Sequence, residues 1–88
     1  MIFCIDIGNS NIKYAIFDGE ELKATFRVTS QRNFTSDEYG VIVRDLLKTA
    51  CIPKDKIKGV IMSSVIPSLN YTMEHMCRDY FGLTPIIV

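Results

Sequence analysis

Residues 2–19 read IFCIDIGNSNIKYAIFDG, two apolar segments separated by a short polar stretch. The apolar segments, 2–7 and 12–17, are rich in β-branched and aromatic side chains, which favour strands. The polar stretch between them, residues 8–11, supplies turn residues, so the sequence predicts two strands joined by a turn. One residue is out of place. Asp6 lies inside the first apolar segment, where burying a carboxylate without a partner would be costly.

The next part of the chain predicts a third strand and a helix. Asp18-Gly19 is a hairpin turn signal, and residues 21–28 alternate apolar and polar side chains, as in a strand with one solvent-exposed face near a sheet edge. Thr35 and Glu38 have the spacing of a helix capping box. The apolar stripe that follows them recurs at helical spacing, and Ile52-Pro53 should end this helix.

The last part of the chain predicts strand, helix and strand. Residues 57–65 are typical of a buried strand. Pro67 suits the start of a second helix, Gly82 suits its end, and residues 85–88 predict a last strand. With right-handed crossovers, the last two strands run parallel to the first. The sequence therefore predicts an α/β fold over residues 1–88, a ribonuclease-H-like mixed five-stranded sheet whose first strand is covered on both faces.

Composition limits the classes of function. Ten basic residues balance ten acidic ones, so no net charge attracts nucleic acid or an anionic membrane. No apolar run approaches the ~20 residues of a membrane span, and the start of the chain lacks the basic region of a signal peptide. Cys4, Cys51 and Cys77 lack the spacing of a zinc site or disulfide framework. We therefore expect buried, reduced thiols in a cytoplasmic protein.

The polar residues around Asp6 predict a phosphate site. Ligands of open α/β sheets collect beyond the carboxyl ends of the strands, where Asp6 lies. Gly8 would allow close approach and a positive φ, and the residues after it offer N–H groups to phosphate oxygens. A carboxylate beside phosphates needs a cation between them, which indicates Mg²⁺ bound mostly through water. The predicted phosphate-binding residues are Asp6, Gly8, Asn9, Ser10, Asn11 and Lys13, with Asp6 as the metal contact.

The residues around Asp6 also allow two alternatives to a phosphate site. Asp6 could cap the tight turn through an Asx hydrogen bond, with its polar neighbours acting only as turn formers. The predicted topology also suits nucleases, but these need several converging carboxylates, and the fourth strand ends in Ser63 and Ser64 instead. These serines would either satisfy the start of the second helix or line the cleft. The neutral charge balance also argues against a nuclease.

Three stretches together resemble type III pantothenate kinases: IDIGNSNIKYAIFDG at 5–19, RVTSQRNFTSDEYG at 27–40 and SSVIPSL at 63–69. DIGNSN at 6–11 also resembles the first phosphate motif of the acetate and sugar kinase, heat-shock chaperone and actin superfamily. The resemblance implies ATP-dependent phosphorylation of pantothenate to 4′-phosphopantothenate in coenzyme A biosynthesis. It places the six predicted residues at the ATP phosphates and their Mg²⁺. It also implies a monovalent cation, K⁺ or NH₄⁺, and a homodimer.

The resemblance also implies that the chain is the amino-terminal half of a two-half, actin-like kinase. Family members are expected to continue past Val88 to a Gly-x-Asp-Arg segment that carries the proposed general base. We therefore expect this half to be inactive alone, and exposed apolar surface at 85–88 to favour self-association. The stretch 27–40 can also be interpreted more simply as a strand end, a loop and a capped helix, with Arg27 and Arg32 in solvent.

Two further functions compete with the kinase. The first is a non-enzymatic module that keeps the half-fold and acts by binding or regulating a partner. The second is another kinase or chaperone-like ATPase of the same superfamily. Both would share the predicted fold, because function depends on the site and not on the fold that carries it.

Overall fold

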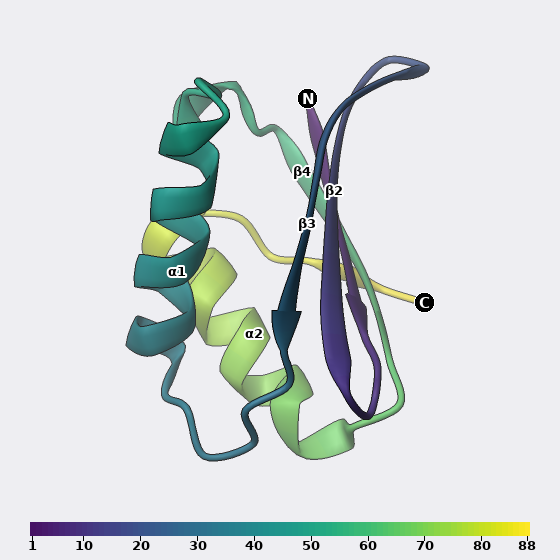
Figure 1. Cartoon of the computed structure of the whole chain (residues 1–88), viewed down its shortest axis with the longest axis vertical. Helices are drawn as coiled ribbons and strands as arrows, with labels where there is room; N and C mark the ends of the chain where they lie inside the picture. The colour runs from purple at the N-terminus through teal and green to yellow at the C-terminus, as the bar shows by residue number, and fades with distance from the viewer.

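A five-stranded sheet and two α-helices make up the structure, a computed structural model that describes residues 1–88 (Figure 1). In chain order, the elements are β1 (Ile2–Ile7), β2 (Asn11–Asp18), β3 (Glu21–Thr29), α1 (Ser36–Thr49), the short 3₁₀ helix η1 (Lys54–Lys56), β4 (Gly59–Ser64), α2 (Pro67–Phe81) and β5 (Ile86–Ile87). The strands are arranged as β3-β2-β1-β4-β5. β1–β2 and β2–β3 are antiparallel, whereas β1–β4 and β4–β5 are parallel. The predicted ribonuclease-H-like topology is confirmed.

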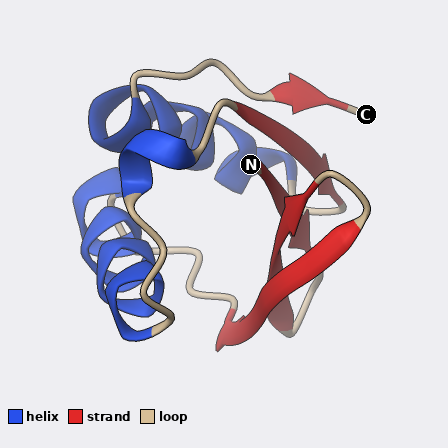
Figure 2. Cartoon of the chain, turned by 90° about the horizontal axis from the view of Figure 1, so that it is seen from above, coloured by secondary structure: helices blue, strands red, loops and turns tan.

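Both helices lie on the same face of the sheet (Figures 1 and 2). The two crossovers, β3 to β4 and β4 to β5, lead into parallel strands and move in the same direction across the sheet. Right-handed connections then put both helices on one side. Alternate residues of β1 and β2 point to that side and are at most 2% exposed: Phe3, Ile5, Ile7, Ile12, Tyr14 and Ile16. Leu69, Met73 and Met76 of α2 complete this core from the other side.

The opposite face of the sheet carries no helix. Ile2 and Asp6 of β1 are exposed on it, and Cys4 between them is half-buried. The prediction that β1 is covered on both faces was therefore wrong. Apolar residues on both faces of a strand also arise from β-propensity, because β-branched side chains fit a half-buried pleated surface. β3 is an edge strand, as predicted.

The start of α1 agrees with the prediction. The Thr35 hydroxyl accepts a hydrogen bond from the Glu38 N–H at 3.2 Å, and the Glu38 carboxylate accepts one from the Thr35 N–H at 3.1 Å. This capping box satisfies two N–H groups that would otherwise have no partner in the helix. Phe34 packs against Tyr39 across the cap, with ring centroids 5.5 Å apart. The chain therefore enters α1 in a well-defined direction.

The end of α1 differs from the prediction. The helix ends at Thr49, before Ile52-Pro53. Cys51 adopts the left-handed conformation, with φ of 59°, and the N–H groups of Cys51 and Ile52 bond back to the last turn at 3.1 and 2.9 Å. This turn exposes Cys51, whereas Cys77 is buried and Cys4 half-buried. The expectation of three buried thiols holds only for Cys77.

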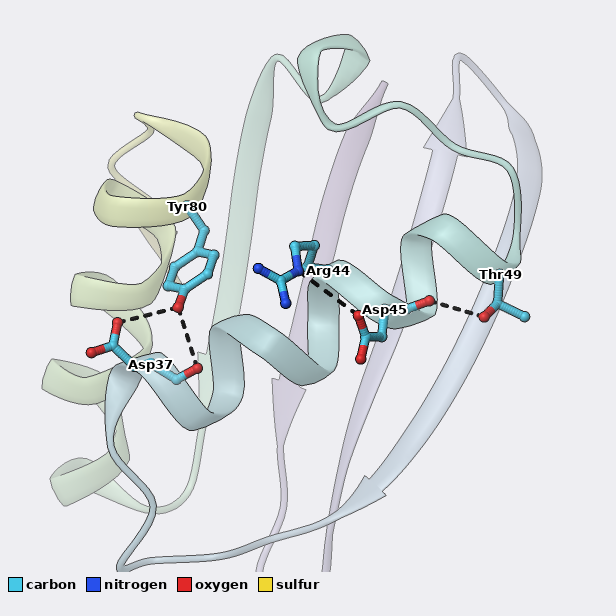
Figure 3. Close-up of polar contacts among 5 residues, drawn as sticks. All are labelled: Asp37, Arg44, Asp45, Thr49 and Tyr80. Carbon is cyan, nitrogen blue, oxygen red and sulfur yellow. Dashed lines mark hydrogen bonds and ion pairs between the residues drawn. The ribbon is translucent and has the colours of Figure 1, made fainter.

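The two helices pack most closely at Gly40 of α1. A Cβ at this position would overlap the ring of Tyr80 of α2. Figure 3 shows the Tyr80 hydroxyl at the start of α1, 3.2 Å from the Asp37 carboxylate and 3.4 Å from the Asp37 carbonyl oxygen. α2 begins with Pro67 in its first turn and ends at Gly82 in the left-handed conformation, as predicted. Neither helix is long and apolar enough to cross a membrane.

Candidate functional site

Four polar side chains form a row across the open face of the sheet. The strand register aligns Asp6 of β1 with Lys13 of β2 and with Ser63 of β4. It also aligns Lys13 with Arg27 of β3. Directly opposed residues in neighbouring strands share a face of the sheet. The row therefore runs from Arg27 through Lys13 and Asp6 to Ser63, from one edge strand toward the other side of the sheet.

This polar row lies in the largest groove of the molecule, which has a volume of about 730 Å³. The groove lies on the open face, and most of its other lining is apolar. Its other lining residues are Cys4, Ile5, Tyr14, Ala15, Thr25, Phe26, Ile61 and Val88. A concave surface with a few convergent polar groups on an apolar floor is the usual form of a small-molecule site.

The carboxylate of Asp6 has one hydrogen-bond partner in the chain. The Ser63 hydroxyl donates to its Oδ1 at 3.1 Å, and no backbone N–H of the following turn donates to it. The alternative in which Asp6 caps the turn through an Asx hydrogen bond is therefore not formed. The three ion pairs of the structure lie elsewhere. Asp6 thus keeps its charge unpaired and its Oδ2 free, on the exposed side of β1.

A single free carboxylate suits one kind of metal site. No group of three or more His, Cys, Asp or Glu side chains is placed to hold a metal ion, so a two-metal nuclease centre does not fit these residues. Mg²⁺ usually keeps several waters and takes one or two carboxylates together with substrate phosphates. Asp6, with one oxygen free, fits that role.

The turn between β1 and β2, residues 8–10, lies beside the polar row at the lower end of the hairpin in Figure 1. The Gly8 N–H donates to the Asn11 carbonyl oxygen at 2.9 Å. Asn9 and Ser10 are exposed, and their N–H groups donate to no other group of the chain. Adjacent free N–H groups in a turn are suited to binding an anion. The turn residues do not line the groove, so they would approach a ligand from its end.

Of the two reasons predicted for Gly8, a positive φ is wrong, and close approach to a ligand stays a prediction. Only Gly19 and Gly82 among the glycines have a positive φ. A Cβ on Gly8 would instead lie 3.0 Å from the Asn11 carbonyl oxygen, closer than such atoms normally approach. The missing side chain, and not a left-handed backbone, explains glycine at this position.

The two serines at the end of β4 have different roles. Ser63 faces the groove and Asp6, as described above. The Ser64 hydroxyl accepts from the Ile66 N–H at 3.0 Å and donates to the Ile66 carbonyl oxygen at 3.1 Å, which shapes the entry into α2. The sequence left two roles open for this pair, and the structure gives one role to each serine.

Comparison with known proteins identifies the family of this chain. A family model described as type III pantothenate kinase matches residues 2–88. The chain belongs to the type III pantothenate kinase family. A protein of Geobacillus kaustophilus (strain HTA426) named type III pantothenate kinase is 41% identical over all 88 residues. A protein of the same name from Pelobacter propionicus is 44% identical over the same length. The chain spans about a third of these relatives, 34% and 35% of their lengths.

A solved structure supports the fold of this family member. The ROK hexokinase from Thermus thermophilus superposes with a TM-score of 0.72, covering 99% of the chain and 34% of the hexokinase, at 10% sequence identity. At this identity the match bears on the fold alone. It agrees with the predicted α/β fold.

Sequence reasoning missed one member of the polar row, Arg27, and the hydrogen bond from Ser63 to Asp6. Arg27 is exposed, as expected, but it also lines the groove beside Lys13, which the sequence did not predict. The alternation in 21–28 did place Arg27 on the polar face of its strand, which was the available signal. The bond from Ser63 to Asp6 had no signal, because it depends on the register between β1 and β4. Arg32 is exposed, as expected.

Proposed function

We propose that this chain is the phosphate-binding part of a pantothenate kinase, which uses ATP and Mg²⁺ to convert pantothenate to 4′-phosphopantothenate. The observation that carries the proposal is the unpaired Asp6 carboxylate, aligned with Lys13 and next to a turn with two free N–H groups. The relatives named type III pantothenate kinase support the choice of substrate. Because the chain spans about a third of their length, we assign the complete reaction to the longer protein.

The chain's own residues would hold the nucleotide phosphates in place. Phosphoryl transfer depends mainly on in-line positioning and on neutralising the charge of the transferred group. Bound Mg²⁺ supplies positive charge to the phosphate oxygens. Asp6 would hold the hydrated ion through its free Oδ2, and the N–H groups of Asn9 and Ser10 would donate to phosphate oxygens. Lys13 would add a positive charge on the other side of Asp6.

Activating the alcohol of pantothenate requires a further group. Asp6 is the only carboxylate that lines the groove, and holding the cation leaves it unable to act as the general base. We therefore infer that the chain alone binds Mg-ATP without catalysing the transfer. An ADP-release assay with the chain, Mg-ATP and pantothenate should show no turnover. Robust turnover would contradict this inference. The monovalent cation and the homodimer stay predictions.

The Asp6→Asn substitution tests the phosphate site directly. Asparagine keeps the shape of the side chain and removes its charge, so we expect Mg-ATP affinity to fall about tenfold or more, measured by calorimetric or NMR titration. Asp18→Asn is the matched control, because Asp18 is an exposed carboxylate at the far end of β2, and it should leave the affinity unchanged. Equal affinity of both variants and the unaltered chain would refute the role of Asp6. Failure of the unaltered chain to bind Mg-ATP would favour the non-enzymatic, partner-binding module.

A further inference from the structure

Hydrogen bonds tie the turn between β1 and β2 to the residue that follows β3. The Ser30 hydroxyl donates to the Gly8 carbonyl oxygen at 2.7 Å. The Ser30 N–H donates to the Ser10 carbonyl oxygen at 2.9 Å. Ser30 is half-buried, so water competes for these bonds less than at the exposed tip of the turn. A single residue therefore holds the turn at two of its carbonyl groups.

The segment containing Ser30 is held in turn by α1. The Tyr39 hydroxyl donates to the Gln31 carbonyl oxygen at 2.7 Å and accepts from the Gln31 N–H at 2.8 Å. Tyr39 is 0% exposed and packs against Phe34. Its hydroxyl is therefore a fixed anchor for the backbone next to Ser30. The linked bonds run from the helix through Gln31 and Ser30 to the turn.

Peptide geometry connects these bonds to the free N–H groups. The Gly8 carbonyl and the Asn9 N–H belong to one planar peptide unit, and the chain contains no cis peptide bond. In a trans peptide, the carbonyl and the N–H point in opposite directions. When Ser30 holds the Gly8 carbonyl, it also sets the direction of the Asn9 N–H. That N–H is one of the two free donors of the proposed phosphate site.

We propose that Ser30 is a positioning residue for the phosphate-binding turn, with Tyr39 as its support on α1. This inference rests on the proposed function, because the ligand positioned is the phosphate chain of Mg-ATP. A donor oriented before the ligand arrives loses less conformational freedom on binding. The proposal also gives a role to Ser30 and Gln31, which the helix cap at Thr35 does not explain.

The experiment compares the unaltered chain with two variants at position 30, Ser30→Ala and Ser30→Thr. Ser30→Ala removes the hydroxyl bond to Gly8 and keeps the backbone bond to Ser10, whereas Ser30→Thr keeps a hydroxyl. In the ligand-free Ser30→Ala variant, ¹⁵N relaxation should show lower backbone order parameters for Asn9 and Ser10 than in the unaltered chain. The Gly8 amide hydrogen should also exchange faster with solvent. NMR titration with Mg-ATP should show an affinity about two- to tenfold weaker, the range expected for one net hydrogen bond. Ser30→Thr should restore both measurements.

Two further variants separate positioning from general damage. Ser68→Ala removes an exposed serine of α2 that makes no side-chain hydrogen bond and should change neither measurement. Tyr39→Phe removes only the support for Gln31, so it should shift both measurements in the direction of Ser30→Ala by a smaller amount. Thermal unfolding checks that each variant is folded under the conditions of the titration.

The outcomes separate this inference from the proposed function. If the unaltered chain binds Mg-ATP, and Ser30→Ala has the same order parameters in the turn and the same Mg-ATP affinity, Ser30 has no positioning role. Weaker binding with an unchanged turn also overturns the inference, as does a failure of threonine to rescue. If the unaltered chain shows no binding at millimolar Mg-ATP, the phosphate site itself is refuted, and with it the ligand that Ser30 would serve.

Discussion

Ile5 and Asp6 are neighbours in β1, but they point to opposite faces of the sheet. Ile5 is 2% exposed in the core under the helices, whereas Asp6 is exposed on the open face and its side chain hydrogen-bonds only with Ser63. Side chains alternate along a strand, so one residue step separates a core position from a site position. The hydrophobic core therefore lies on one face of the sheet, and the other face carries the proposed ligand site.

The strongest test of this contrast between the faces is Ile5→Ala. Removing a buried aliphatic side chain should lower the free energy of unfolding by about 2–5 kcal/mol, measured by urea denaturation. Cys4→Ala is the control from the open face, where a half-buried thiol should cost about 1 kcal/mol or less. Equal losses would mean that the open face is as well packed in solution as the covered face, for instance through self-association.

The second-largest effect is expected at alkaline pH, which should lower the free energy of unfolding through groups buried on the covered face. Burial raises the pKa of the Cys77 thiol from 9.0 to about 12 and also raises the pKa of Tyr14. Below pH 9 both states keep the thiol proton and the stabilisation is complete. Between pH 9 and 12 the unfolded chain releases the Cys77 proton while the folded chain keeps it. The free energy of unfolding should then fall, by up to about 1.4 kcal/mol per pH unit for each group.

Two cysteine variants test whether Cys77 causes this pH dependence. Urea denaturation across the alkaline range should show a shallower pH slope for Cys77→Ala than for the unaltered chain. Cys51→Ala removes an exposed thiol and should leave the slope as it is. Identical slopes for both variants would show that Cys77 does not contribute.

The smallest effect on stability is expected on the open face, from Ser63→Ala. Asp6 would lose its hydrogen-bond donor, so Mg-ATP affinity should fall several-fold, while the free energy of unfolding changes by about 0.5 kcal/mol or less. The neighbouring Ser64→Ala should do the reverse: it should cost about 1 kcal/mol through the entry into α2 and leave the affinity unchanged. Equivalent behaviour of the two serines in either measurement would contradict the proposed division between the faces.

Most of the fold could be predicted because its signals are local. The Thr35–Glu38 capping box, Pro67 and Gly82 each act within a turn or two of the chain, and the structure contains all of them as expected. The order of strands and helices then leaves few topologies once crossovers are right-handed. The exposure of Cys51 escaped prediction, because a non-glycine residue rarely takes the left-handed conformation that ends α1.

The site was harder to predict than the fold, because its contacts are long-range. Arg27 reaches the row only through the register of β2 and β3, which shifts between Ile16 and Phe17. A shift of one residue moves side chains to the other face of a sheet, so the sequence alone does not align Arg27 with Lys13. The bond from Ser30 to Gly8 spans 22 positions in the chain and has no local pattern.

The close packing at Gly40 links the helices to the end of the molecule where the proposed phosphate site lies. Gly40 leaves room for the ring of Tyr80, and the hydroxyl of the preceding residue, Tyr39, holds the backbone of Gln31. A larger side chain at position 40 would push α1 away from α2 and carry the Tyr39 hydroxyl with it. Nucleotide affinity would then respond to a substitution that touches neither phosphate nor metal. A substitution at position 40 would thus adjust the proposed phosphate site from a distance and leave every residue proposed to contact the ligand intact.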